Sequence, residues 1–164
     1  MRCAFQARRA AYEAAGRTLV WIDESGFAHD RPHRYGYAPV GQRCYGRWDW
    51  HAKERTNVIG ALLDFQLIAV GLFESSVNAE VFLAWTHRVL LPQLPPATMI
   101  VLDNAAFHKR QDIQNTLRQA GHTRGYLPPY SPDLNPIEHQ WAQAKALCKQ
   151  SHCSVDELFR SNQI

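Results

Sequence analysis

The sequence predicts an α/β fold in which helices flank a mixed β-sheet. Residues 18–23 and 98–103 are two continuous apolar segments of strand length, and each ends in an aspartate. Residues 56–63 and 66–73 are rich in β-forming side chains and are separated by a short turn, which predicts an antiparallel hairpin. Fully apolar strands need cover on both faces. We therefore expect helices on both sides of parallel central strands, with the hairpin at one side of the sheet.

Local signals predict the other elements of the first two thirds of the chain. Residues 1–17 are rich in alanine and arginine, which favours a helix. Residues 30–50 contain scattered prolines and glycines, which are typical of a long loop. Asn78 is a suitable N-cap for a helix that is expected to end near residue 91, because Pro92 follows it.

The last third of the chain alternates helix, strand and helix. Residues 110–120 predict a helix that ends before Gly121, and residues 123–127 predict a short strand. A proline-rich turn then leads to a long helix over residues 136–150 and a weaker helical signal over residues 155–160. A chain of 164 residues is large enough to fold as one domain without disulfides.

The composition is that of an ordinary globular protein, with 46% hydrophobic and 20% charged residues and a net charge of +3. No apolar stretch approaches the roughly 20 residues of a membrane helix, and no secretory signal is expected in residues 1–16. The four cysteines show no disulfide pattern, which predicts reduced thiols and a cytoplasmic location without a membrane partner.

Basic and aromatic residues alternate in the segment 31–55. Arginines suit phosphate groups and aromatic rings suit nucleic-acid bases. A solvated loop that its aromatic residues anchor to the core explains the same pattern equally well. The candidate DNA contacts of this segment are Arg31, Arg34, Arg43, Arg47, Lys53 and Arg55.

The two strand-end aspartates, Asp23 and Asp103, are the first candidates for chemistry. Either one alone is more simply explained as a turn cap or as the partner of an arginine. Two of them on neighbouring central strands would bring like charges together, and such an arrangement is tolerated mainly when a cation lies between them. Glu24 follows Asp23, so strand alternation is expected to turn it to the other face and away from the site.

Glu138 has two possible roles. Asn135, Pro136 and Glu138 stand at the N-cap, N1 and N3 positions of the last long helix, which is the pattern of a capping box. A glutamate in a first helical turn is also well placed to reach a site at the end of the sheet. Local physics does not decide between these roles.

Longer motifs connect the three acidic residues. Asp103 and Glu138 are separated by 34 residues, and they lie within the conspicuous segments 101–108 and 126–141. With residues 22–27 and 35–42, these segments closely resemble the DDE transposases of the mariner superfamily, in particular its bacterial insertion-sequence branch. The resemblance covers about residues 19–145.

This resemblance implies a ribonuclease-H-like fold, with a five-stranded mixed sheet flanked by helices. It assigns the catalytic and metal-binding triad to Asp23, Asp103 and Glu138. The triad would hold two Mg²⁺ ions, for which Mn²⁺ can substitute. It also suggests Asn104 and His108 as accessory residues that orient the substrate or the attacking oxygen. The implied reaction is metal-dependent DNA cleavage at element ends, followed by transfer of the freed 3′-hydroxyl to target DNA.

The same resemblance sets expectations for domains and partners. Residues 1–17 would be an N-terminal extension or remnant, and residues 18–164 the catalytic domain. The partners would be terminal inverted repeats and target DNA, bound by a homodimer in a nucleoid-associated synaptic complex. A helix-turn-helix module would be supplied by a separate chain. The alternatives are another ribonuclease-H-like nuclease and a truncated, non-catalytic remnant that only binds DNA.

Overall fold

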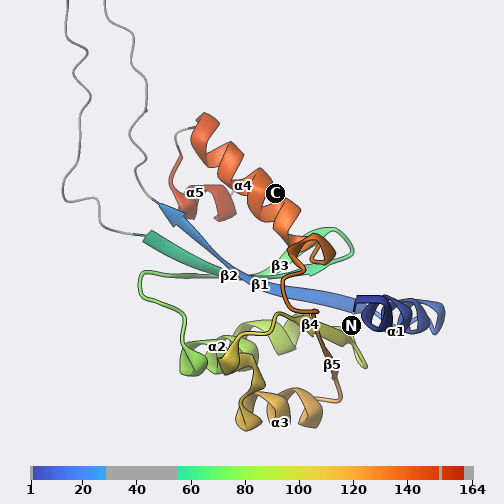
Figure 1. Ribbon diagram of the computed structural model, residues 1–164. Helices are drawn as coiled ribbons and strands as arrows, with labels where there is room; N and C mark the ends of the chain where they lie inside the picture. Colours follow the sequence, from blue (N-terminus) through green and yellow to red (C-terminus); the bar gives the residue numbers. More distant parts are fainter. Residues whose placement is uncertain (1, 29–54, 152, 161–164) are drawn as a thin grey trace, which may run out of the picture.

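A five-stranded sheet with the strand order β3-β2-β1-β4-β5 forms the centre of the molecule (Figure 1). The computed structural model describes residues 2–28, 55–151 and 153–160. Strand β1 pairs in parallel with β4, which pairs in parallel with β5, whereas β2 and β3 form an antiparallel hairpin on the other side of β1. The predicted mixed sheet is therefore confirmed. The strands are β1 (Leu19–Ala28), β2 (Arg55–Leu63), β3 (Gln66–Phe73), β4 (Met99–Leu102) and β5 (Thr123–Tyr126).

Strand β1 is longer than the apolar pattern predicts. The apolar run ends at Asp23, but the strand continues to Ala28 because β2 pairs with it along this whole length. Its pairing with β4 stops much earlier, at Trp21 and Val101. Asp23 and the residue after it therefore lie just beyond the point where β1 and β4 separate.

The turn between β2 and β3 explains why the hairpin is tight. Asp64 and Phe65 both have positive φ angles, 45° and 69°. Two-residue turns with positive φ at both positions match the right-handed twist of antiparallel strands. The predicted hairpin is confirmed with a two-residue connection.

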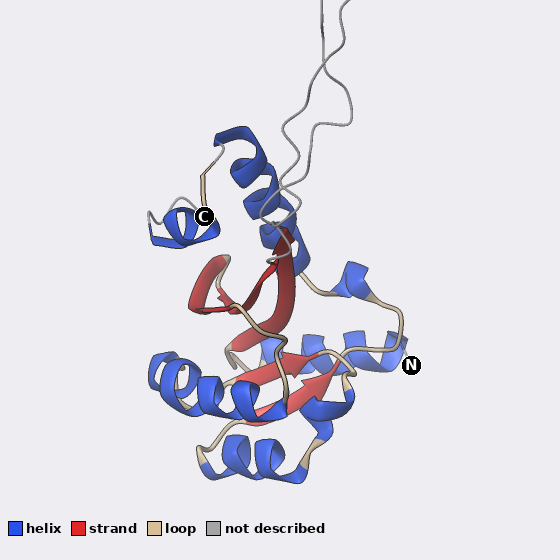
Figure 2. Ribbon diagram, turned by 90° about the vertical axis from the view of Figure 1, so that its left-hand side faces the viewer, coloured by secondary structure: helices blue, strands red, loops and turns tan. Residues whose placement is uncertain are grey.

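Helices cover both faces of the sheet (Figures 1 and 2). One apolar core joins the first face to helices near the two ends of the chain, and a second core joins the opposite face to helices from the middle of the chain. The first group comprises α1 (Arg2–Ala14), α4 (Ile137–Ser151) and α5 (Val155–Arg160), and the second comprises α2 (Ala79–Trp85) and α3 (Gln111–Gln119). None of the helices in the described part of the chain is long and apolar enough to cross a membrane.

Helix α1 packs directly against the sheet. Phe5 is buried and meets Trp21 of β1 edge-to-face, with ring centroids 6.3 Å apart. The guanidinium of Arg9 lies over the same indole at 5.2 Å from the ring centroid. The N-terminal segment thus shares the core of the first face.

Helix α2 begins as predicted but changes its geometry before residue 91. Asn78 caps it, since its Oδ1 accepts from the backbone nitrogens of Glu80 and Val81 at 3.0 and 2.9 Å. The helix then widens into a π-helical turn over Thr86–Leu90 and ends in a 3₁₀ turn. Thr86 fits this buried position because its hydroxyl donates to the carbonyl of Phe82 at 2.8 Å.

Candidate metal centre

Three carboxylates meet where β1 leaves β4. Asp23, Glu24 and Asp103 each offer a carboxylate oxygen, and these atoms all lie within 4.8 Å of one another. The backbone explains the cluster, because the register places the end of β4 beside the middle of β1. The structure thus brings together Asp23 and Asp103, two of the three predicted acidic residues.

Glu24 joins this cluster although it was not expected there. Strand alternation does turn it away from Asp23, and its cross-strand neighbour Ile59 belongs to the second core. No β4 residue pairs with it, however, and its carboxylate lies within 4.8 Å of that of Asp103. Alternation alone could not reveal this, because it assumes that the neighbouring strand continues.

His108 bridges two of the carboxylates from the second face. It lies in the 3₁₀ turn η3 (Ala106–Lys109), and its side chain is 0% exposed. Its Nδ1 lies 2.6 Å from Oδ1 of Asp103, and its Nε2 lies 3.0 Å from Oε1 of Glu24. A fully buried ring cannot contact a substrate directly, so His108 acts through the carboxylates that it holds.

The charges of this bridge stabilise one another. Burial alone would lower the pKa of His108, but its hydrogen bonds to Asp103 and Glu24 outweigh burial and raise that pKa to about 9. Burial would raise the pKa of Asp103, but the hydrogen bonds from His108 and the Ala105 backbone outweigh it and lower that pKa. At neutral pH, His108 is therefore a cation that donates to two carboxylates.

Asp103 keeps one oxygen available. Its Oδ1 accepts both from His108 and from the backbone nitrogen of Ala105, at 2.6 and 2.8 Å. Its Oδ2 accepts no hydrogen bond within the residues that the structure describes, and the side chain is 43% exposed. This arrangement fixes the carboxylate and leaves Oδ2 open to a ligand.

Asp23 is held from the first face. Trp141 of α4 donates from its Nε1 to Oδ2 of Asp23 at 3.2 Å. Burial, followed by the negative charges of Glu138 and Glu24, raises the pKa of Asp23 to about 7. The Asp23 carboxyl group is thus partly protonated near neutral pH, and a cation that enters the site would favour loss of this proton.

Glu138 lies next to the cluster rather than within it. It is exposed in the first turn of α4, and its charge is the largest electrostatic influence on Asp23. The capping-box alternative receives no support, because Oδ1 of the buried Asn135 has no hydrogen-bond partner within the described residues. Only the backbone carbonyl of Asn135 accepts from the nitrogen of Glu138, at 3.2 Å. The charge of Glu138 instead acts on Asp23.

Asn104 has a structural contact. Its side-chain amide donates to the backbone carbonyl of Leu127. This bond ties the end of β4 to the residue after β5 and so fixes the backbone that carries Asp103. The structure thus places Asn104 beside the site as a support of its backbone.

The predicted DNA contacts lie mostly outside the described residues. Of the six, only Arg55 is described; it is exposed at the start of β2, and its guanidinium covers Gly26 of β1. The remaining five lie in the segment that the structure does not describe: Arg31, Arg34, Arg43, Arg47 and Lys53.

The model of the DDE superfamily endonucleases matches residues 18–159, which is most of the chain. The chain belongs to this family. Among curated protein sequences, none shows significant similarity to it.

Solved structures of the Mos1 transposase share the fold of this DDE endonuclease domain. A Mos1 paired-end complex with the left transposon end has a TM-score of 0.69 and 20% identity, over 90% of this chain and 47% of that chain. The Mos1 catalytic domain with Raltegravir and Mg has a TM-score of 0.68 and 18% identity, over 97% of this chain and 76% of that chain. The expected ribonuclease-H-like fold is confirmed. The chain spans about half the length of the Mos1 chain in the paired-end complex.

The donor set of this DDE domain fits a hard divalent cation. All candidate ligands are carboxylate oxygens, which Mg²⁺ and Mn²⁺ prefer. Asp23, Asp103 and the nearby Glu138 would hold the metal, and His108 orients Asp103 and Glu24 through one carboxylate oxygen of each. The clustered carboxylates also explain why a cation would be favourable, since their like charges gather within 4.8 Å of one another, with His108 and, near Asp103, Lys109 as neighbouring cations.

Gly60 makes room for the tryptophan that holds Asp23. It is the cross-strand neighbour of Asp23 on β2. A Cβ at this position would lie 2.7 Å from Cη2 of Trp141, which is closer than Cβ contacts allow. The indole can therefore lie on the sheet beside Asp23 only because residue 60 has no side chain.

Gly60→Ala is expected to lower the free energy of unfolding by roughly 1–3 kcal/mol, because overpacking displaces the buried Trp141. Urea denaturation measures this loss. A double-mutant cycle with Trp141→Phe is the control, since the smaller ring should relieve the clash and make the two changes non-additive. Strictly additive losses would show that Gly60 does not serve Trp141.

Asp23→Asn is expected to stabilise the metal-free protein at alkaline pH. A carboxyl with a pKa raised by folding contributes stability below its unfolded pKa, and this contribution is lost as pH rises through about 7. Asparagine mimics the neutral form and still accepts from Trp141. With EDTA present, the difference in unfolding free energy between variant and parent should shift in favour of the variant by roughly 2–4 kcal/mol as the pH rises from 5 to 8.5.

Thermal unfolding across that pH range tests this expectation. Asp64→Asn is the matched control, because Asp64 is exposed at a positive φ angle that asparagine readily adopts. The control should run parallel to the parent at every pH. An equally parallel curve for Asp23→Asn would show that Asp23 has an ordinary pKa.

Proposed function

We propose that this DDE domain is the catalytic domain of a cut-and-paste DNA transposase. It would cleave DNA strands at the ends of its element and join the freed 3′-hydroxyl to target DNA. The observation that carries the proposal is the carboxylate cluster of Asp23, Glu24 and Asp103, with Glu138 beside it, at the strand ends of a DDE endonuclease domain. DNA complexes among the similar Mos1 structures support DNA as the substrate.

We further propose Mg²⁺ as the metal, with Mn²⁺ as a substitute. Similar Mos1 paired-end complexes are titled with Mn and with Mg, which supports either ion. Two bound ions would stabilise the attacking and leaving oxygens of an in-line displacement at phosphorus. Asp103 would offer its open Oδ2, and His108 would keep the carboxylate oriented. Asp23 would lose its proton on metal binding, and Trp141 would keep its side chain in place.

We also propose a family branch, domain bounds, an oligomeric state and a place of action. The motifs around Asp23, Asp103 and Glu138 support the bacterial insertion-sequence branch of the mariner superfamily. Residues 18–164 would form the catalytic domain, with residues 1–17 as an extension. A homodimer would bring two element ends together, and a DNA-reading module outside residues 1–164 would select those ends. The place of action would be the nucleoid.

A strand-joining assay tests the proposed function. The 164-residue chain is mixed with a labelled, precut duplex of the element end, a supercoiled plasmid, and Mg²⁺ or Mn²⁺. We expect nicked plasmid and plasmid covalently joined to the label, both absent with EDTA. Cleavage without joining would favour another ribonuclease-H-like nuclease. The absence of both products, together with DNA binding, would indicate a non-catalytic remnant.

A further inference from the structure

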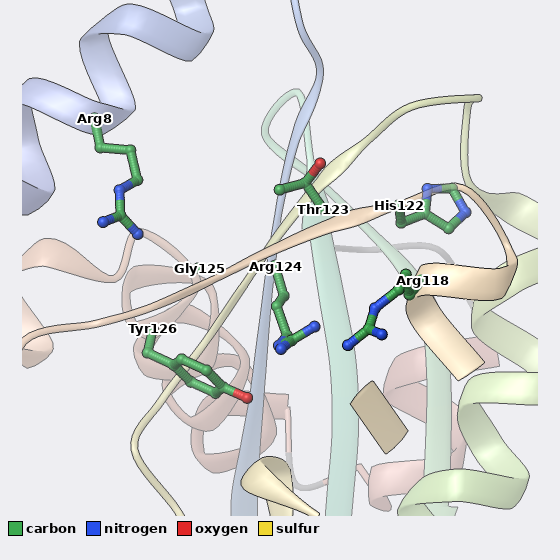
Figure 3. Close-up of a pocket in the computed structure, with 7 residues that line it drawn as sticks. All are labelled: Arg8, Arg118, His122, Thr123, Arg124, Gly125 and Tyr126. Atoms are coloured by element: carbon green, nitrogen blue, oxygen red, sulfur yellow. The ribbon is translucent and has the colours of Figure 1, made fainter. Parts of the chain in front are cut away.

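A basic hollow lies along β5 at the open edge of the sheet, away from the carboxylates. Its volume is about 490 Å³, and it is bounded by α1, the end of α3 and β5. Arg8, Arg118 and Arg124 contribute one guanidinium from each of these elements, and no carboxylate of the described residues lines it (Figure 3). Three like charges that gather in one concavity repel one another unless an anion is present.

These arginines lack the carboxylate partners that three other described arginines have. Arg2, Arg9 and Arg110 each form an ion pair with a carboxylate. Within the described part of the chain, none of the three arginines of the hollow forms such a pair. Arg124 donates only to the neutral Oε1 of Gln114, at 2.7 Å, which holds its side chain in place. No carboxylate among the described residues therefore pairs with the charges of the hollow, and the bond to Gln114 already holds one of them in place.

The wall of the hollow also offers polar groups that have no partner within the described part of the chain. The backbone nitrogens of Thr123 and Leu127 donate toward β4, at 3.0 and 2.8 Å. Strand alternation turns the N–H groups of Arg124 and Tyr126 to the open edge. Nδ1 of His122 is buried and has no hydrogen-bond partner among the described residues. Edge N–H groups beside arginines are suitable donors for phosphate oxygens.

One residue of the hollow also contacts a residue of the metal centre. Tyr126, at its end, donates from its hydroxyl to the backbone carbonyl of His108 at 3.1 Å. In the register of the sheet, Tyr126 pairs with Leu102, the residue before Asp103. Arg124 lies two positions earlier, so roughly 10 Å of strand separates it from the level of Asp103. A strand bound at the carboxylates could thus extend along β5.

We propose that this hollow binds backbone phosphates of the DNA on which the metal centre acts. The inference rests on the proposed function and adds a second DNA contact to it. Arginine also protects an edge strand from pairing with other chains, but that role needs only Arg124 on β5. It leaves the convergence of Arg8 from α1 and Arg118 from α3 unexplained.

DNA binding by charge-matched variants tests the proposal. The affinity for a fluorescent 30-base-pair duplex is measured by anisotropy in EDTA between 50 and 200 mM KCl. Arg118→Gln/Arg124→Gln should bind about tenfold more weakly at 100 mM KCl, with a salt slope shallower by about two, because each lost phosphate contact removes about one unit. Adding Arg8→Gln should remove about one more unit of slope.

Arg88→Gln/Arg160→Gln is the control with the same change of charge, because it also removes two arginines; both are exposed, and neither lines the hollow. It should retain the parent's affinity within about twofold and the parent's slope. Arg118→Lys/Arg124→Lys should restore most of the slope and thereby exclude misfolding as the cause. Equal slopes for the Arg118/Arg124 and control variants would overturn the proposal.

The strand-joining assay separates this proposal from the proposed function. If the parent chain joins strands and the hollow variants bind DNA like the control, only the proposed role of the hollow is refuted. A parent chain that binds DNA through the hollow but neither cleaves nor joins strands in Mg²⁺ or Mn²⁺ would refute only the proposed function.

Discussion

Asp103→Asn is expected to reduce divalent-metal-dependent DNA cleavage by about 10³-fold or more. Oδ1 of Asp103 is occupied by His108 and Ala105, so the metal depends on the charge at Oδ2. An amide provides a neutral carbonyl or an NH₂ group there, and neither replaces a carboxylate as a ligand of Mg²⁺. Losing about 4 kcal/mol of transition-state stabilisation corresponds to such a factor. The measurement is the nicking rate of supercoiled plasmid at saturating Mn²⁺.

Asp64→Asn is again the matched control for this carboxylate-to-amide change. It should nick DNA at the parent's rate, because Asp64 lies in the β2–β3 turn. Thermal unfolding provides a second readout: Mn²⁺ should raise the melting temperature of the parent and of the control but not that of Asp103→Asn. A variant that nicks within threefold of the parent would remove Asp103 from the catalytic site.

His108→Ala is expected to cost the fold about 3–5 kcal/mol, a loss of roughly 10 °C in melting temperature. The change leaves a cavity against the ring of Phe82, whose centroid lies 4.5 Å from that of His108. It also leaves Asp103 and Glu24 facing each other without the cation that separates them. Nicking should fall as well, because Asp103 loses a bond that fixes its carboxylate.

The control is His87→Ala, which removes an exposed imidazole from the π-helical turn. Its melting temperature should stay within about 2 °C of the parent's. His108→Gln distinguishes packing from charge, because it restores side-chain volume without a cation. It should recover stability only in part. Full recovery by glutamine would show that His108 merely fills space.

The sequence predicts the sheet well, because the features that define it are local. Apolar strands that end at Asp23 and Asp103, and a hairpin around Asp64, need no knowledge of distant contacts. The site is harder to predict, since Glu24 enters it only because β4 is four residues long while β1 is ten. Relative strand lengths depend on tertiary pairing, which periodicity does not reveal.

The residues that hold the catalytic carboxylates in place can be predicted from the sequence only in part. Trp141 lies three residues after Glu138, so helical spacing could have placed the two on one face of α4. The indole reaches Asp23 of β1 only because Gly60 of β2 has no Cβ to block it. His108 was predicted as an accessory residue. Its complete burial, which makes it a support of Asp103, follows only from packing against Phe82 and Phe107.

The site lies between the two apolar cores that cover the opposite faces of the sheet. Trp141 fastens Asp23 to one core, and His108 fastens Asp103 to the other. An ion held jointly by the two aspartates would link the helices on one face of the sheet to those on the other. Changes deep in either core, far from any carboxylate, should then register as altered metal affinity. Conversely, metal binding should slow amide hydrogen exchange in α4 and in η3 together.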